Sequence, residues 1–267
     1  MSRFQSRTAS DCPRMKVRCH RRQGQHTFYR QMVHDWLGLP FDQIAVVDGD
    51  TDQVTYGDGT YASRSVTVGG SALRRACDGV IARGRGIAAK LIGVAESELE
   101  FERGLFVSRD SNASMSLSEV AVASYRVQGH PAELGVGLEA VGTYTAQPQN
   151  YPNGCHIAEV EVDPDFGTVS LMRYSAVDDV GRAVNPLLLE GQLAGATAMG
   201  LGQALLEQVV HDDLGQQITA AFTEYGVPRA GHMAEIQWCA TWARSAVRWP
   251  TTTRRPITLE RCFVSAQ

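Results

Sequence analysis

The sequence predicts an α+β fold in which long helices pack on mixed β-sheets. Apolar residues recur at three- and four-residue spacing over long stretches, which indicates amphipathic helices. In other stretches apolar and polar residues alternate, which is typical of half-buried strands. The chain of 267 residues and 29.1 kDa is long enough for one large or two modest domains with a real core.

A helix and a strand open the patterned region. Apolar residues at helical spacing predict a helix that Thr27 caps and Gly38 ends. Residues 44–47 are expected to form a short buried strand. Residues 71–94 hold a long amphipathic pattern, and the glycines inside it favour a kink or close packing, because glycine costs roughly 1 kcal/mol relative to alanine in a helix.

Shorter elements follow. Two strands are expected at residues 99–101 and 105–107, on either side of a turn. The segment Ser116-Leu-Ser-Glu119 is a capping box that opens a helix at residues 120–125. Strand-like alternation returns at residues 142–146.

A hairpin and a helix complete the pattern. Residues 155–162 and 169–177 alternate on either side of a turn, which predicts a β-hairpin. Asn185 is a favourable N-cap and Pro186 suits the first helical position, so a long helix is expected over residues 187–210.

The two ends of the chain show neither helical nor strand periodicity. Residues 1–22 are expected to be a basic, unpatterned and disordered flank, residues 23–229 a domain, and residues 230–267 an aperiodic tail rich in Arg and Trp. Both ends have the composition of a GC-rich gene read out of frame, and we expect neither to join the core.

The composition excludes several classes of protein. Hydrophobic residues make up 43% and charged residues 20%, which excludes a disordered or collagen-like chain. A net charge of −4 excludes a generally basic nucleic-acid binder, and no apolar run approaches the about 18 residues of a membrane span. The six cysteines lack CxxC spacing and are expected to be reduced and mostly buried. With no secretory signal in view, we expect a cytoplasmic protein.

Several familiar motifs fail on inspection. Asp48, Asp50 and Asp52 begin like a calcium loop, but Gln53 and Gly59 stand where that loop needs Gly and Glu. Two segments that fit a dinucleotide-binding pattern follow a loop or lie inside a helix, which argues against a Rossmann site. The sequence has no GxxxxGK[ST], HExxH or GxSxG motif, so no motif supports a hydrolase or phosphotransferase function.

Three polar, glycine-rich segments remain. They are QGQH at residues 23–26, GTYASRS at residues 59–65 and EGQ at residues 190–192. Each places amide, hydroxyl or backbone N–H donors beside glycine, which suits an anionic ligand rich in hydrogen-bond acceptors, such as a pterin pyrophosphate.

Together these segments, with residues 31–76 and 151–207 around them, resemble the molybdenum-cofactor-binding large subunit of the xanthine dehydrogenase, aldehyde oxidase and aerobic carbon monoxide dehydrogenase family. The resemblance covers residues 23–229. It implies that this domain is part of the C-terminal, molybdopterin-binding half of a molybdenum hydroxylase large subunit.

The resemblance also implies which residues hold the cofactor. A GQG loop of the family aligns without a gap on Gln23 and Gly24, and Gln25, beside His26, is the alternative position for its glutamine. The implied cofactor-binding residues are Gln23, Gly24, Thr60, Ser63, Arg64, Ser65 and Gln192. No protein metal ligand is implied, because the ligands of molybdenum are cofactor sulfurs and oxo or hydroxo groups.

The family implies an oxidoreductase that oxidises or hydroxylates an aldehyde, a purine or other heterocycle, or carbon monoxide, with oxygen from water. The implied cofactor is molybdenum–molybdopterin in its cytosine dinucleotide form. FAD and 2Fe–2S clusters are expected on partner flavin and iron–sulfur subunits, and the substrate is a small molecule.

Two departures from the family leave a second function open. The family's N-terminal half, which completes the substrate pocket, has no counterpart, and the sequence has no GExG segment to supply the glutamate base. The alternative to a hydroxylase fragment is therefore a truncated, non-catalytic product that only binds the cofactor or a partner subunit.

Overall fold

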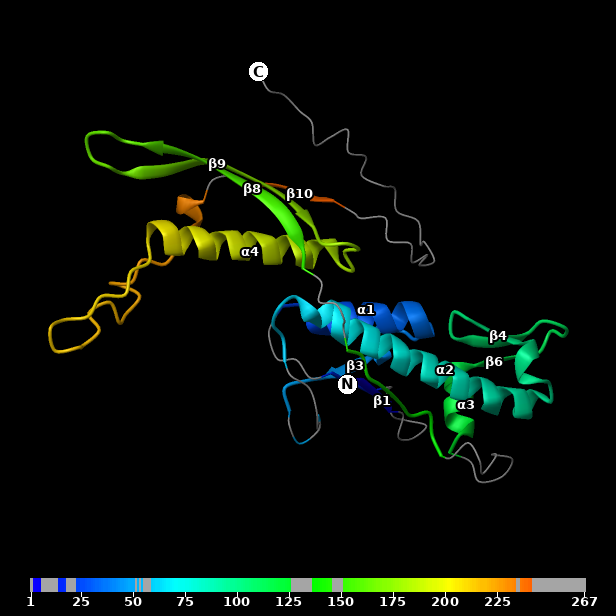
Figure 1. Ribbon diagram of the computed structural model, residues 1–267. Coiled ribbons are helices and arrows are strands. Elements are labelled where there is room, and N and C mark those ends of the chain that lie inside the picture. The colour runs from blue at the N-terminus through cyan, green and yellow to red at the C-terminus, as the bar shows by residue number, and fades with distance from the viewer. Residues whose placement is uncertain are drawn as a thin grey trace, which may run out of the picture. The chain divides into compact units, whose positions relative to one another are not determined.

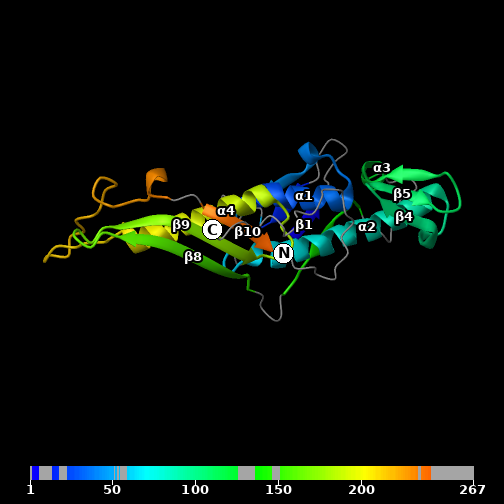
Figure 2. The ribbon, with the colours of Figure 1, turned by 90° about the horizontal axis from the view of Figure 1, so that it is seen from above.

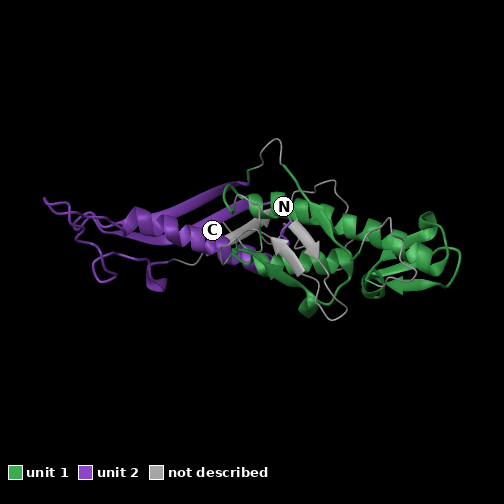
Figure 3. Ribbon diagram, turned by 90° about the horizontal axis from the view of Figure 1, so that it is seen from below, with its two compact units in different colours: residues 1–151 green, residues 152–267 purple. Residues whose placement is uncertain are grey.

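The computed structural model describes residues 2–5, 14–17, 23–50, 52, 54, 59–125, 136–145, 151–233 and 236–241. The chain divides into two compact units, Met1–Tyr151 and Pro152–Gln267 (Figure 3). Each unit combines helices with a sheet that contains both parallel and antiparallel pairs, so the predicted α+β class with mixed sheets is confirmed (Figure 1). Over the described ranges, no helix is long and apolar enough to cross a membrane.

Helix α1 (Gln25–Leu37) belongs to the first unit. It starts after Gly24, whose φ of 83° is left-handed and whose carbonyl accepts hydrogen bonds from the main-chain N–H groups of Thr27 and Phe28, both at 3.0 Å. The prediction that Thr27 caps this helix is therefore wrong, because Gly24 already begins the turn. The predicted end is confirmed at Gly38, which has a φ of 66°.

Helix α2 (Ser71–Ile92) lies beside α1 (Figure 1) and continues from a π-helical turn, Ser65–Gly70. Its buried face is made of small and aliphatic residues. Gly84 packs against the ring of Phe106, where an added Cβ would lie 2.7 Å from Cζ. The close packing predicted for the glycines of this helix is thus confirmed at Gly84.

A small antiparallel sheet lies near the C-terminal end of α2 (Figure 2). Its strands, in spatial order, are β4 (Leu99–Glu102), β5 (Leu105–Ser108) and β6 (Ser114–Ser116). Helix α3 (Leu117–Ala123) follows, and the predicted capping box is confirmed: the N–H of Glu119 donates to Ser116 Oγ, and Ser116 donates back to the Glu119 carboxylate. The helix begins three residues earlier than the sequence predicts.

The second sheet of this unit contains strands from distant parts of the chain. Its spatial order is β3 (Ala45–Val47), β2 (Arg14–Val17), β1 (Ser2–Gln5) and β7 (Ala140–Gly142), with only the β3–β2 pair parallel. Strand β3 confirms the predicted buried strand, whereas β7 ends where a strand over residues 142–146 was expected to begin; residue 146 lies outside the described residues. We expected residues 1–22 to lack regular structure. This prediction is wrong for residues 2–5 and 14–17, which form β1 and β2.

The second unit is built on a hairpin. Strands β8 (Asn153–Val162) and β9 (Val169–Asp179) pair antiparallel with an irregularity after Glu159, which confirms the predicted hairpin. Strand β10 (Ile236–Thr241) pairs parallel to β9. The expectation that the tail after residue 230 stays apart is therefore wrong for these six residues, because pairing with a distant strand, and not local periodicity, forms β10.

Helix α4 (Pro186–Leu205) follows the hairpin. Asn185 caps it as predicted, since its Oδ1 accepts the main-chain N–H of Leu188 at 3.0 Å. The helix ends five residues before the predicted Val210, where the N–H groups of Leu206 and Glu207 both donate to the carbonyl of Gly202. Most residues of α4 are exposed, and the well-buried core of the described chain lies in the first unit.

Candidate cofactor-binding site

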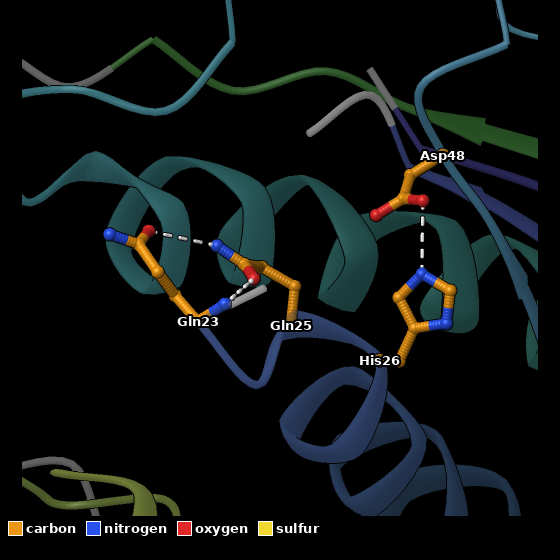
Figure 4. Close-up of polar contacts among 4 residues, drawn as sticks. All are labelled: Gln23, Gln25, His26 and Asp48. Atoms are coloured by element: carbon orange, nitrogen blue, oxygen red, sulfur yellow. Dashed lines mark hydrogen bonds and ion pairs between the residues drawn. The ribbon is translucent and has the colours of Figure 1, made fainter. Parts of the chain in front are cut away.

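The N-terminus of α1 holds two reciprocally bonded glutamines (Figure 4). The main-chain N–H of Gln23 donates to Gln25 Oε1 at 3.0 Å, and Gln25 Nε2 donates to Gln23 Oε1 at 3.1 Å. Gly24 between them takes the left-handed conformation that brings the two side chains together. Gln25 is only 2% exposed, whereas Gln23 is half-buried, so Gln23 is the more accessible of the two alternative positions.

A hydrogen bond between an imidazole and a carboxylate lies beside these glutamines (Figure 4). His26 Nε2 lies 2.9 Å from Asp48 Oδ1, and the carboxylate is 9% exposed against 53% for the imidazole. The pair ties the first turn of α1 to the segment after β3. In the described part of the chain, no three His, Cys, Asp or Glu side chains gather as a protein-held metal ion would require.

The segment before α2 has an unusual backbone. Ala62 and Ser63 have φ values of 48° and 54°, although neither is glycine, and Gly59 has a φ of 84°. A left-handed conformation costs roughly 1–2 kcal/mol for such residues. Strain of this kind gathers at ligand sites, and main-chain N–H groups in successive turns form concavities that bind anions. Both Ala62 and Ser63 are exposed.

Side chains of the same segment add a cation and two hydroxyls. Arg64 Nη1 donates to Tyr61 Oη at 2.6 Å, and its guanidinium carbon lies 4.7 Å from the centre of the Tyr61 ring. The hydroxyls of Thr60 and Ser65 are hydrogen-bonded to each other at 2.9 Å. The segment therefore offers a fixed positive charge beside main-chain and hydroxyl donors.

The start of the helical run that includes α2 reinforces this charge. Arg64 is the cap of the π-helical turn Ser65–Gly70, which leads directly into α2, and its first turn has no acidic residue. The partial positive charge of a helix N-terminus therefore acts at the same place as the guanidinium. Such an N-terminus is well suited to a phosphate group.

A tyrosine joins the two parts of the first unit that hold predicted site residues. Tyr29 Oη, on α1, donates to the main-chain carbonyl of Ser65 at 2.8 Å. The structure thus ties α1, the helix that follows Gln23 and Gly24, to the end of the 59–65 segment.

Gln192 lies on the second turn of α4, in the second unit, and is exposed. Its helix neighbours Gly191 and Gly195 have open space where a Cβ would be. The predicted site residues are accordingly divided, with six in the first unit and Gln192 in the second.

Sequence reasoning missed two residues that shape the segment before α2. Tyr61 lies inside the GTYASRS segment, so its closeness to Arg64 was an available signal. Tyr29 had no such signal, because it lies on the apolar face of a helix and its partner Ser65 is 36 residues away.

Comparisons with known proteins show which family the chain belongs to. Residues 22–234 match the family described as "Molybdopterin cofactor-binding domain". The chain is 32% identical over 219 residues to the 6-hydroxypseudooxynicotine dehydrogenase complex subunit gamma of Paenarthrobacter nicotinovorans, a match that covers 82% of this chain and 28% of that protein. It is 34% identical over 209 residues to the carbon monoxide dehydrogenase large chain of Afipia carboxidovorans, covering 78% of this chain and 26% of that protein.

Solved structures give the same result. The fold is similar to that of quinoline 2-oxidoreductase from Pseudomonas putida 86, with a TM-score of 0.80, 30% identity, and coverage of 92% of this chain and 31% of that one. The chain spans about a quarter of the length of the two curated relatives. Since the family match covers most of the chain, the resemblance found in the sequence is confirmed, and this chain belongs to the molybdopterin cofactor-binding domain family of xanthine dehydrogenase-type large subunits.

Proposed function

We propose that the chain is the cofactor-holding part of a molybdenum hydroxylase large subunit. The observation that carries this proposal is the left-handed pair Ala62 and Ser63 next to Arg64, at the N-terminus of a long helical run. Strained, exposed main chain beside a guanidinium is the arrangement that an anionic ligand stabilises.

The residues present fit the chemistry of molybdopterin. Its phosphate groups need cations and N–H donors, and its pterin edge needs amide and hydroxyl partners. Arg64 and the main-chain N–H groups around Ser63 supply the first set. Thr60, Ser65 and Gln23 supply the second.

Each residue has a distinct part in this proposal. Arg64, held against Tyr61, binds the phosphate region with Ser63, and the paired hydroxyls of Thr60 and Ser65 hydrogen-bond beside it. Gly24 lets the chain approach closely, so that Gln23 reaches the pterin. Gln192, on α4 of the second unit, is proposed to bind the cofactor on the family resemblance alone. When bound, the cofactor supplies a molybdenum centre that takes up electrons from the substrate.

The finer assignments follow from the family. The cofactor is proposed to be the cytosine dinucleotide form, with FAD and 2Fe–2S clusters on partner subunits in the cytoplasm. The names of the relatives, a subunit of a dehydrogenase complex and a large chain, support a multi-subunit enzyme. The substrate class is a small aldehyde, purine or other heterocycle, or carbon monoxide.

A second candidate is a chain that binds the cofactor or a partner subunit without turnover. The lack of a GExG segment favours it, since loss of a general base typically costs about 10² to 10⁴ in rate. Dye-linked oxidation of aldehydes and purines by the purified, metal-replete chain tests the second candidate. Turnover would contradict it, whereas bound cofactor without turnover is expected both of a cofactor-holding part of a hydroxylase and of the second candidate.

The proposal of cofactor binding is tested by the content of the purified full chain. We expect molybdenum and pterin to co-purify with the wild type in a host that makes the cofactor. Both should be depleted in Arg64→Ala and retained in Arg109→Ala, which removes an exposed arginine of the same unit that pairs with Glu100. Absence of pterin from the wild type would contradict the proposal.

A further inference from the structure

The Gln23–Gln25 pair contains a fixed polarity. A main-chain N–H can only donate, so the atom of the Gln25 carboxamide that faces the N–H of Gln23 at 3.0 Å must be its oxygen, Oε1. The Nε2 of Gln25 then faces Gln23, and the atom that meets it at 3.1 Å must be an acceptor, Gln23 Oε1. One main-chain group thus determines the orientation of two side-chain amides.

This polarity decides what Gln23 presents to its surroundings. With its oxygen held by Gln25, the Nε2 of Gln23 points away from the pair (Figure 4). Within the described part of the chain, this nitrogen has no hydrogen-bond partner. Gln23 therefore has N–H donors to offer, while its carbonyl is already used.

Burial makes the constraint strong. Gln25 is 2% exposed, so water is poorly placed to satisfy its amide in the reversed orientation. Reversal would set its NH₂ group against the N–H of Gln23, which leaves buried donors unpaired at a cost well above that of a surface hydrogen bond. The same burial keeps Gln25 from contacting a ligand itself.

We infer that Gln25 is a positioning residue that makes Gln23 a hydrogen-bond donor, and that Gln23 consequently recognises an acceptor atom of the molybdopterin cofactor. The inference rests on the proposed cofactor-binding function. Its first part, the orientation of the two amides, is a property of the free chain and is measured without ligand.

The amide orientation is tested by side-chain NH₂ exchange in the ¹⁵N-labelled full chain. The signals of Gln23 and Gln25 are assigned by their loss in Gln23→Ala and Gln25→Ala. We expect the Gln25 NH₂ to be protected from solvent exchange and the Gln23 NH₂ to exchange as a free side chain does. Protection of the Gln23 NH₂ with free exchange at Gln25, or equal exchange at both, would overturn the inference.

Gln25→Glu reverses the expected polarity. The new carboxylate accepts from the main-chain N–H with one oxygen and presents an acceptor to Gln23 with the other, so the Gln23 amide turns and its NH₂ becomes protected. The control is Gln203→Glu at an exposed glutamine of α4, where the Gln23 signal should not change. If the buried carboxylate prevents folding, the wild-type exchange rates decide alone.

Affinity for molybdopterin cytosine dinucleotide, followed by pterin fluorescence, tests the second part. Gln23→Ala and Gln25→Glu should each weaken binding about ten-fold, the effect of one lost hydrogen bond, and the double variant should be no weaker than Gln23→Ala alone. Additive losses would show that Gln25 acts independently of Gln23 and would overturn the positioning role. Failure of the wild type to bind would instead refute the proposed function and the second part, while the exchange rates still decide the orientation.

Discussion

The phenol oxygen of Tyr29 donates a hydrogen bond of 2.8 Å to the main-chain carbonyl of Ser65. Tyr29 is 1% exposed, so the contact is well protected from solvent. It anchors the turn that leads into α2 to the first turns of α1. Gly69 makes this possible, because a Cβ at that position would collide with the phenol oxygen.

Removing this oxygen should loosen the turn. For Tyr29→Phe we expect the free energy of unfolding to fall by about 1 kcal/mol, since the part-buried hydrogen bond to the Ser65 carbonyl is lost while the ring stays in place. Urea unfolding followed by circular dichroism measures the change. Tyr144→Phe is the matched control, because its ring contact with Arg75 survives the substitution; an equal loss in both variants would contradict the account.

Alanine should stabilise α4 at Gly191. A Cβ there meets nothing within 4 Å, so the gain in helix propensity, up to about 1 kcal/mol, is not offset by a clash. Gly202→Ala is the opposing control, since its Cβ would collide with Pro228. Thermal unfolding should rank Gly191→Ala above the wild type and Gly202→Ala below it, and a loss at Gly191 would refute the open environment assigned to it.

The capping box of α3 should weaken in acid. Hydrogen bonds from the main chain and side chain of Ser116 lower the pKa of Glu119 below its ordinary value of 4.5. A lowered folded-state pKa means that its contribution to stability is present above pH 4.5 and is lost as the pH falls through the folded-state value. The slope of unfolding free energy against pH below 4.5 should therefore be smaller in Glu119→Gln; an unchanged slope would contradict this.

Cys77 should be inert in the folded chain. Burial raises its pKa to about 12, so almost no thiolate exists at pH 8, whereas Cys155 is exposed. Iodoacetamide at pH 8 should label Cys155 and leave Cys77 unmodified, as peptide mass spectrometry measures. Both should react in urea, and rapid native labelling of Cys77 would place it outside the core.

The sequence predicts those parts of the fold that depend on contacts between residues close together in the chain. Gly38 ends α1, Asn185 begins α4 and Ser116 pairs with Glu119, and each of these depends on neighbours within four residues. The sequence predicted Thr27 as the N-cap of α1 because threonine is a better cap than most residues. In the structure Gly24 is the N-cap, so the helix begins before Thr27. Strand β10 could not be predicted, because parallel pairing with β9 stabilises a segment too short to show a period.

The candidate site likewise has parts that the sequence predicts and parts that it does not. Ser63 and Arg64 could be named because they fall within a family segment, but the left-handed backbone at Ser63 is not visible in its residue type. The role of Gln25 depends on its hydrogen bond with the main-chain N–H of Gln23. The role of Tyr29 depends on the carbonyl of Ser65, which is 36 residues away in the sequence. Such contacts arise only once the chain has folded.

The central claim, that the segment around Arg64 binds the anionic part of molybdopterin, is tested most directly by equilibrium binding of molybdopterin cytosine dinucleotide to the cofactor-free full chain. A hydrogen bond from a guanidinium to an anion contributes about 1.5–3 kcal/mol, so Arg64→Ala should weaken binding roughly ten- to a hundred-fold, while Arg109→Ala binds as the wild type does. Equal affinity of Arg64→Ala and the wild type would contradict the claim.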